Sequence, residues 1–182
     1  MTGSSFTPAG GPPASGTAAP PKETGRSLAA AALVGVALMA AVDEIVFHQL
    51  LGWHHFYDRS TPKVGLLTDG LLHTGELLGL VVGLVWWADL RRRRALSSAH
   101  AWAGLFLGLG AFQLFDGLID HKLLRLHQIR YGVPDLLPYD LAWNAAGLML
   151  LAVGAVLAVR AARTAHKGAE PGKAGRPGAG ER

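Results

Sequence analysis

The chain has 182 residues and a formal net charge of +4, and half of its residues are hydrophobic. Its mean hydropathy of +0.27 is too high for an ordinary soluble domain of this length, so the composition predicts membrane helices. The absence of cysteine excludes disulfides, thiolate metal sites and cysteine nucleophiles. The basic residues cluster at the ends of apolar runs, which indicates a membrane topology signal and argues against a nucleic-acid partner.

The two terminal segments have compositions typical of disorder. Residues 1–25 are rich in Gly, Pro, Ser, Thr and Ala, and residues 164–182 are basic and glycine-rich. We expect both to be disordered cytoplasmic tails. The folded part is then one transmembrane domain over residues 26–163.

Four apolar stretches lie between the tails, each near the ~20 residues that cross a bilayer. They cover residues 27–53, 64–88, 99–126 and 137–159. The first is too long for a cleaved signal peptide and contains Asp43 and Glu44. The predicted fold class is all-α, a polytopic membrane four-helix bundle.

Lys and Arg predict the orientation of these helices. The clusters are Lys22 with Arg26, Arg91 to Arg94, and Arg160 with Arg163 and Lys167. They precede the first helix, follow the second and follow the fourth. Both termini are therefore expected in the cytoplasm, with the connections at 53–63 and 127–138 outside.

One polar pattern occurs twice in the chain. DEIVFHQLLGWHH from Asp43 aligns without gaps with DGLIDHKLLRLHQ from Asp116, and the following apolar stretches also align. The alignment pairs Asp43, His48, His54, Asp69 and His73 with Asp116, His121, His127, Asp140 and Asn144, respectively. The sequence thus predicts tandem helical hairpins, over residues 27–88 and 99–160, around a quasi-twofold polar centre.

The polar residues are expected to face inward at three depths. A charged Asp at the bilayer centre costs about 2.5–3.5 kcal/mol on insertion scales, so lipid-facing acids would oppose insertion. The helix rise of ~1.5 Å per residue places one layer in the outer leaflet, a deeper layer of acids, and a third layer at the outer mouth. The first holds His48, His73, His121, Asn144, Asp69 and Asp140; the second Asp43, Glu44, Glu76 and Asp116; the third His54, His55, Asp58 and His127.

Helical facing supports this arrangement only in part. Asp69, His73 and Glu76 follow i, i+4, i+7 spacing and share a face. Asp43 and His48, however, lie about 140° apart at ~100° per residue, and their counterparts in the second repeat show the same conflict. Periodicity leaves open which acid joins which histidine, and a local distortion is needed for both to face one axis.

The leading functional hypothesis is an outward-facing pocket that binds a transition metal. Histidines and carboxylates at one depth suit zinc, copper(II), iron or manganese. We expect His48, His73 and His121 as ligands, with Asp69 and Asp140 as ligands or as partners that orient the imidazoles.

The remaining polar residues have secondary roles in this hypothesis. Asp43, Glu44 and Asp116 would balance protons or hold a second cation. His54, His55 and His127 would capture the ion at the mouth, and Asn144 belongs to the same layer as the ligands.

Several alternatives remain open on the sequence. Facing histidines could hold haem in a membrane redox protein, although haem pockets do not need so many acids. A metal could activate water in an intramembrane hydrolase, with Glu44 or Glu76 as the base. Buried Asp–His pairs could also act only as polar glue between helices. The sequence does not separate an enzyme from a carrier or an assembly factor.

Four segments carry a resemblance to a known family. DEIVFHQLLGWHHFYD, TDGLLHTGE, LFDGLIDHKLLRLHQIRYG and YDLAWN resemble bacterial four-helix membrane proteins of the domain-of-unknown-function family twenty-two forty-three. The resemblance covers residues 26 to 160 and implies no established activity. Members of this family tend to be encoded near maturation factors for cytochrome c oxidase. The resemblance therefore implies copper or haem handling, with a respiratory oxidase or its assembly factors as partners.

Overall fold

The computed structural model describes residues 20–169, so the expected tails at 1–19 and 170–182 lie outside the described residues. Every regular element in the described part is helical. The elements are α1 (Thr24–Val42), η1 (Asp43–Leu50), α2 (Pro62–Arg92), α3 (Ser98–Phe115), η2 (Asp116–Leu123) and α4 (Leu137–Ala169). The α1–η1 and α3–η2 pairs are each one continuous helix, so the all-α prediction of four long helices is confirmed.

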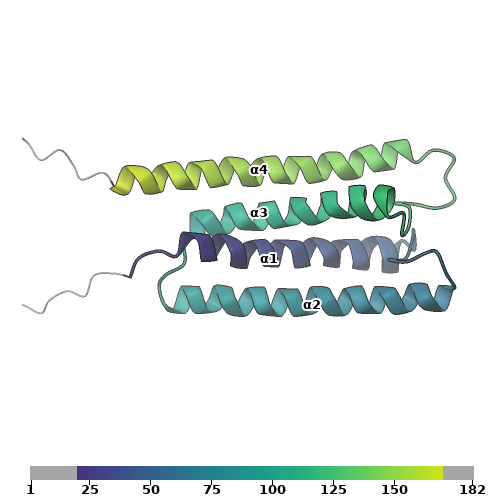
Figure 1. Ribbon diagram of the computed structural model, residues 1–182, viewed down its shortest axis with the longest axis horizontal. Coiled ribbons are helices and arrows are strands. Elements are labelled where there is room, and N and C mark those ends of the chain that lie inside the picture. The colour runs from purple at the N-terminus through teal and green to yellow at the C-terminus, as the bar shows by residue number, and fades with distance from the viewer. Residues whose placement is uncertain (1–19, 170–182) are drawn as a thin grey trace, which may run out of the picture.

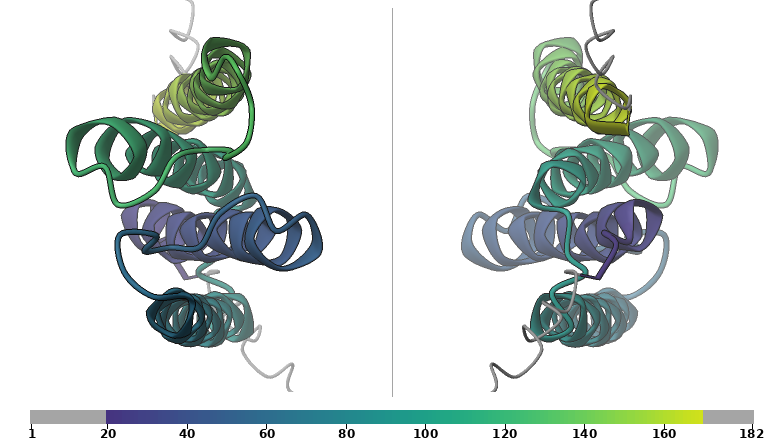
Figure 2. Two further views of the ribbon diagram at one scale, coloured as in Figure 1. Left: turned by 90° about the vertical axis from the view of Figure 1, so that its right-hand side faces the viewer. Right: turned by 90° about the vertical axis from the view of Figure 1, so that its left-hand side faces the viewer.

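The helices form a row in the order α2, α1, α3, α4 (Figures 1 and 2). α1 packs on α3 in the middle, while α2 and α4 pack on the outer sides of α1 and α3. In the described residues α2 and α4 do not contact each other. The polar residues of the two hairpins can therefore meet only through the α1–α3 pair and the loops that follow it.

Small residues allow α1 and α3 to approach closely. A Cβ atom added to Gly104 would lie 2.1 Å from the Leu28 carbonyl oxygen, and one added to Gly108 would lie 2.1 Å from that of Ala32. From the other helix, a Cβ on Gly35 would lie 2.2 Å from the Leu105 oxygen. Backbones in such contact are typical of membrane helices, in which association depends on close packing. This seam fixes how α1 and α3 cross, while η1 and η2 beyond it do not contact each other (Figure 2).

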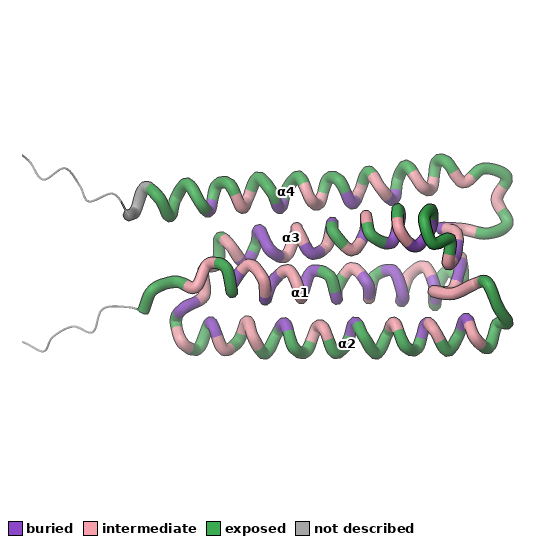
Figure 3. Tube along the Cα trace, in the orientation of Figure 1, coloured by how far each residue is buried: buried purple, intermediate pink, exposed green. Residues whose placement is uncertain are grey.

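The outer surface is apolar over the length of the helices. All four helices are long and apolar enough to cross a membrane. In the most apolar window of the α1–η1 and α3–η2 helices, 44 % and 39 % of residues are buried, against 11 % and 17 % in α2 and α4 (Figure 3). α1 and α3 therefore form the interior of the fold, and α2 and α4 expose most of their surface.

Along the helix axes, the two ends of the row carry different chain segments. The start of α1, the α2–α3 connection and the end of α4 lie at one end, and the two connections at 51–61 and 124–136 lie at the other (Figure 1). The first of these is the basic end, which carries Arg91 to Arg94. The second is the polar end, which carries η1, η2 and the histidines His48, His54, His121 and His127.

Candidate metal centre

The two inner helices change their winding where the acids occur. η1 and η2 are π-helices of eight residues that begin at Asp43 and Asp116. Because a π-helix bonds i to i+5, residues five apart stand one turn above each other. Asp43 and His48 thereby reach the same side, as do Asp116 and His121. This is the local distortion that the sequence required but did not specify.

Each π-helical aspartate contacts two histidines. Asp43 Oδ2 lies 3.4 Å from His48 Nε2, and Asp43 Oδ1 lies 4.0 Å from His54 Nε2. In the second repeat, Asp116 Oδ2 lies 3.2 Å from His121 Nε2, and Asp116 Oδ1 lies 3.4 Å from His127 Nε2. The same oxygens therefore face the same nitrogens at corresponding positions of the two hairpins.

His54 and His127 reach the interior because the chain reverses just before each of them. Gly52 and Arg125, at corresponding positions, have φ values of +58° and +52°. This left-handed conformation turns each connection back over the end of the row. Both histidines lie on the connections that follow the inner helices and are nonetheless buried, with exposed fractions of 4 % and 1 %.

Hydrogen bonds between the two connections orient the same histidines. His54 Nδ1 donates to the carbonyl oxygen of Ile129 at 2.9 Å, and His127 Nδ1 donates to that of Phe56 at 2.8 Å. Each bond crosses to the opposite hairpin. Because a carbonyl can only accept, the proton lies on Nδ1, and Nε2 of a neutral ring keeps its lone pair. Both lone pairs are thus available on the side that faces the aspartates.

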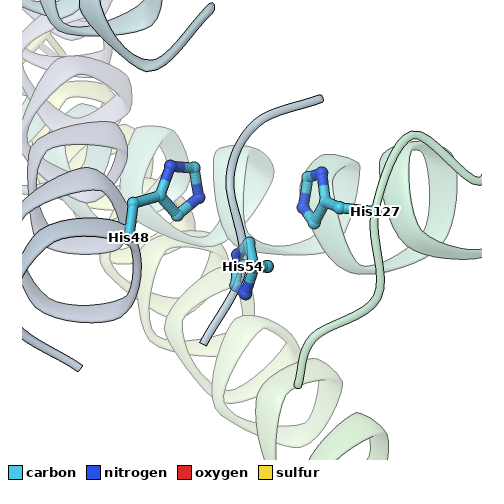
Figure 4. A group of neighbouring side chains, drawn as sticks. All are labelled: His48, His54 and His127. Atoms are coloured by element: carbon cyan, nitrogen blue, oxygen red, sulfur yellow. The ribbon is translucent and has the colours of Figure 1, made fainter. Parts of the chain in front are cut away.

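Four imidazoles are in mutual contact at the polar end. The rings of His54 and His127 stack at 4.5 Å with an interplanar angle of 5°. His48 lies 4.5 Å from His54, and His121 lies 4.6 Å from His127, both edge-on. Figure 4 shows His48, on its helix, and His54 and His127, on the two connections, converging on one region.

Two further carboxylates surround the outer nitrogen of His48. His48 Nδ1 lies 2.7 Å from Glu44 Oε2 and 3.2 Å from Asp69 Oδ1, although neither contact is aligned as a hydrogen bond. Asp69 also accepts from the backbone N–H of Phe56 at 2.7 Å and contacts His55 Nδ1 at 2.5 Å. Asp69 therefore ties α2 to the connection that carries His54 and His55.

Three of the expected site residues lie away from this centre. The His73 side chain is 47 % exposed and contacts Glu76 at 2.5 Å. Asp140 contacts Lys122 at 2.5 Å, and Asn144 donates to the Asp140 carbonyl oxygen. The structure therefore brings together eight of the expected residues, joins His55 to them through Asp69, and leaves these three outside. The eight are Asp43, Glu44, His48, His54, Asp69, Asp116, His121 and His127.

Many polar atoms of the centre are buried without a hydrogen-bond partner in the described structure. They include both ring nitrogens of His48 and of His121, and Nε2 of His54 and of His127. Native proteins pair more than ninety per cent of such atoms, so a cluster of exceptions needs an explanation. A cation or a proton donor beside these atoms would supply the missing partner.

The electrostatics of the two connections differ. Burial and the neighbouring imidazoles of His127 and His48 lower the pKa of His54 to about 2, so this ring is neutral at physiological pH. Burial also opposes protonation of His127, but the contact of its Nε2 with the Asp116 carboxylate and the charge of that carboxylate raise its pKa overall. His54 Nε2 therefore stays unprotonated at physiological pH, whereas the His127 ring takes up and releases a proton.

Three overlapping groups of side chains have the geometry of a metal site. In each group one ligand atom per residue lies within 4.8 Å of the others, and every member is buried. The groups are His48, His54 and His127; Asp116, His121 and His127; and Glu44, His48 and Asp69. Imidazole and carboxylate together suit zinc, iron, manganese and copper(II).

A comparison with known families agrees with the fold and the polar pattern. Residues 30–161 match the family model described as "Predicted membrane protein (DUF2243)". The chain belongs to this family. It is an integral membrane protein, since the matched segment contains nearly all of its four membrane-length helices. No curated protein and no solved structure matches the chain.

Sequence reasoning about this DUF2243 protein missed the two carbonyl groups that orient the mouth histidines. Phe56 and Ile129 are apolar, and their functional atoms are in the backbone. A signal was present, because Phe56 follows His54 by two residues and Ile129 follows His127 by two residues. Equal offsets of apolar residues are common, so the pattern alone carries little information.

Proposed function

We propose that this membrane protein binds a transition metal ion through the histidines and aspartates at the polar end of its helix row. The observation that carries the proposal is the pair of His54 and His127 Nε2 atoms, which are buried, without hydrogen-bond partners, and beside carboxylates. An aspartate oxygen and an imidazole lone pair are both acceptors. Two such atoms stay close only with a proton or a cation between them.

A purely structural role fits this geometry less well. Buried polar networks stabilise a fold when all their members are paired, whereas partly satisfied networks are costly. Here both ring nitrogens of His48 and of His121 lack partners. The two crossed hydrogen bonds already hold the connections together, so further unpaired imidazoles would lower the stability of the fold without joining its helices.

The haem alternative fits less well too. Bis-histidine ligation requires a macrocycle between two imidazoles. In five of the six pairs among the four clustered rings, the centroids lie 4.5 to 5.9 Å apart. Insertion of a porphyrin would require the crossed bonds from His54 and His127 to break.

The enclosure of the centre favours metal holding or transfer over hydrolysis. The four histidines and their aspartates are all at most 4 % exposed. A metal hydrolase needs an open coordination position and room for its substrate. We therefore assign the protein to metal handling, with respiratory oxidase maturation as its context and an oxidase or its assembly factors as partners. The positive-inside rule places the termini in the cytoplasm of a bacterial cell and the metal on the outer side of the plasma membrane.

Metal analysis of the protein purified in mild detergent tests the proposal. Wild type is expected to retain metal through gel filtration, and the His54→Ala/His127→Ala double variant is expected to lose it. His100→Ala is the matched control, because His100 lies at the basic end and its Nδ1 pairs with Ser97 Oγ at 2.9 Å. Equal, substoichiometric metal in all three proteins would overturn the proposal, and a Soret band would restore the haem alternative.

A further inference from the structure

The polar end contains two half-sites of the same composition. One consists of Asp43, His48 and His54, and the other of Asp116, His121 and His127. We infer that the centre holds two divalent cations, one in each half-site. This inference rests on the proposed metal-binding function and specifies its stoichiometry and geometry.

The distances within each half-site suit ligands of one ion. Zinc lies about 2.1 Å from nitrogen and oxygen ligands, and two such ligands at a tetrahedral angle are about 3.4 Å apart. The aspartate–histidine distances are 3.2 and 3.4 Å in the second half-site and 3.4 and 4.0 Å in the first. Each aspartate presents a different oxygen to each of its histidines, so its carboxylate can lie beside one ion with both rings.

The crossed hydrogen bonds hold the two half-sites together. His54 belongs to one half-site but is oriented by Ile129 of the other hairpin, and His127 is oriented by Phe56 in the same way. Two backbone bonds repeat the exchange, from Asp58 N–H to Leu126 oxygen and from Tyr131 N–H to Trp53 oxygen. Neither hairpin can therefore complete its half-site without the other. Stacking of His54 on His127 makes the half-sites direct neighbours.

The charge of the interior supports two ions. The buried acids among the described residues are Asp43, Glu44, Asp69, Glu76, Asp116 and Asp120, and no lysine or arginine there is buried. Four of these acids contact the clustered histidines, namely Asp43, Glu44, Asp69 and Asp116. Buried charges need partners, and one divalent cation balances only two carboxylates. Two divalent cations balance four, with all four imidazoles neutral and free to coordinate.

The two half-sites differ around the outer nitrogen of their helical histidine. His48 Nδ1 lies 2.7 Å from Glu44 and 3.2 Å from Asp69, whereas no carboxylate of the described residues lies within 4.0 Å of His121 Nδ1. The sequence explains the difference, because Gly117 stands at the position that corresponds to Glu44. The counterpart of Asp69 is Asp140, which pairs with Lys122 instead. Carboxylates behind a ligating imidazole raise its basicity and fix its tautomer. The first half-site should therefore bind its ion more tightly and fill first.

A metal titration tests this inference on the full chain in detergent. After treatment with a chelator, the protein is titrated with Co²⁺, whose absorption reports coordination, and then with Zn²⁺. Bound metal is counted after gel filtration. Wild type is expected to bind two ions per chain in two steps. His48→Gln should remove the tight step, and His121→Gln should remove the weak step, each leaving one ion.

Each result separates this inference from the proposed function. Saturation of wild type at one ion per chain overturns the two-ion centre and leaves metal binding itself standing. Binding of no ion overturns both. Two ions in wild type with both retained in His48→Gln and His121→Gln would place them elsewhere and overturn the assignment. Glutamine keeps polarity and similar volume, and the gel-filtration profile against His100→Ala shows whether each variant folds.

Discussion

Charged side chains are exposed or half-exposed at the basic end of the helix row and buried at the polar end. At the basic end, Glu23 pairs with Arg26 and Arg93, and Asp89 pairs with Arg92 and Arg93, at N–O distances of 2.5 to 2.9 Å. These groups are exposed or half-exposed. The arginines lower the pKa of Glu23, and Glu23 and Asp89 in turn raise the pKa of Arg93, so every member is ionised and paired.

The polar end buries its charges and leaves them incomplete. Its aspartates and histidines are within 4.0 Å of each other, yet most of their inward atoms lack hydrogen bonds. The two ends contain similar carboxylates, so residue type does not explain the difference. The charged groups of the basic end pair with one another, whereas the proposed metal ion would supply the partner that the inward atoms of the polar end lack. Four predictions test this contrast.

The largest effect is expected from removal of both crossed histidines. His54→Ala/His127→Ala deletes a ligand from each half-site and both hydrogen bonds between the connections. We expect metal content below one-tenth of wild type and a lower melting temperature, because a bound metal stabilises the fold by linkage. Removal of metal from wild type by a chelator should lower the melting temperature in the same direction. A wild-type melting temperature that does not respond to chelator would contradict the proposed role of a cation at the polar end.

A smaller effect is expected when the half-sites are made alike. Glu44→Gln removes one carboxylate from behind His48, and loss of such a partner typically costs 10–100-fold in metal affinity. The measurement is the affinity of the tighter step in a Co²⁺ titration. Asp140→Asn is the matched control, since Asp140 pairs with Lys122 and should leave both steps unchanged. Equal losses in the two variants would show that the carboxylates act through net charge alone.

The pH dependence of metal binding should show competition with the proton of His127. His127 has a raised pKa, so it stays protonated to higher pH than an ordinary histidine, and metal must displace that proton. Affinity is therefore expected to fall as pH falls through this raised pKa, by about tenfold per pH unit. His54, with a pKa of about 2, contributes no such competition. Calorimetry in two buffers of different ionisation enthalpy counts the proton, and binding without proton release would argue against His127 as a ligand.

The smallest effect is expected at the basic end. Arg93→Ala removes the ion pairs to Glu23 and Asp89, but exposed pairs contribute little to stability. We expect a slight decrease in melting temperature and unchanged metal content, measured side by side with wild type. A large loss of metal in this variant would mean that the two ends are coupled.

The sequence by itself determined the framework of this protein. The four helices and the gathering of histidines and acids at one end follow from hydropathy and from the cost of charge in lipid, and the structure has both. These effects act along the chain within each helix, so a single sequence displays them. The correspondence of Asp43, His48 and His54 with Asp116, His121 and His127 predicted one polar centre shared by the two hairpins, but it left open which acid joins which histidine.

In α2, helical spacing predicted the burial of only some of the polar side chains. Asp69 and Glu76, seven residues apart, are both buried, as expected. His73 is turned about 60° from Glu76 at ~100° per residue, and it reaches the exposed edge. The sequence gives the angles between side chains but not the direction of the neighbouring helix. The width of the buried face was therefore decided by how α2 packs on α1.

The tertiary structure alone decided how the centre is assembled. A pattern based on 3.6 residues per turn sets Asp43 and His48 apart, and the π-helices bring them together through i to i+5 bonding. The reversals at Gly52 and Arg125 turn the connections back, so that His54 and His127 are buried. Carbonyl groups of the opposite hairpin then select the nitrogen that each presents. The hydrogen bonds to these carbonyl groups join residues more than seventy positions apart, so only the packing of α1 on α3 could establish them.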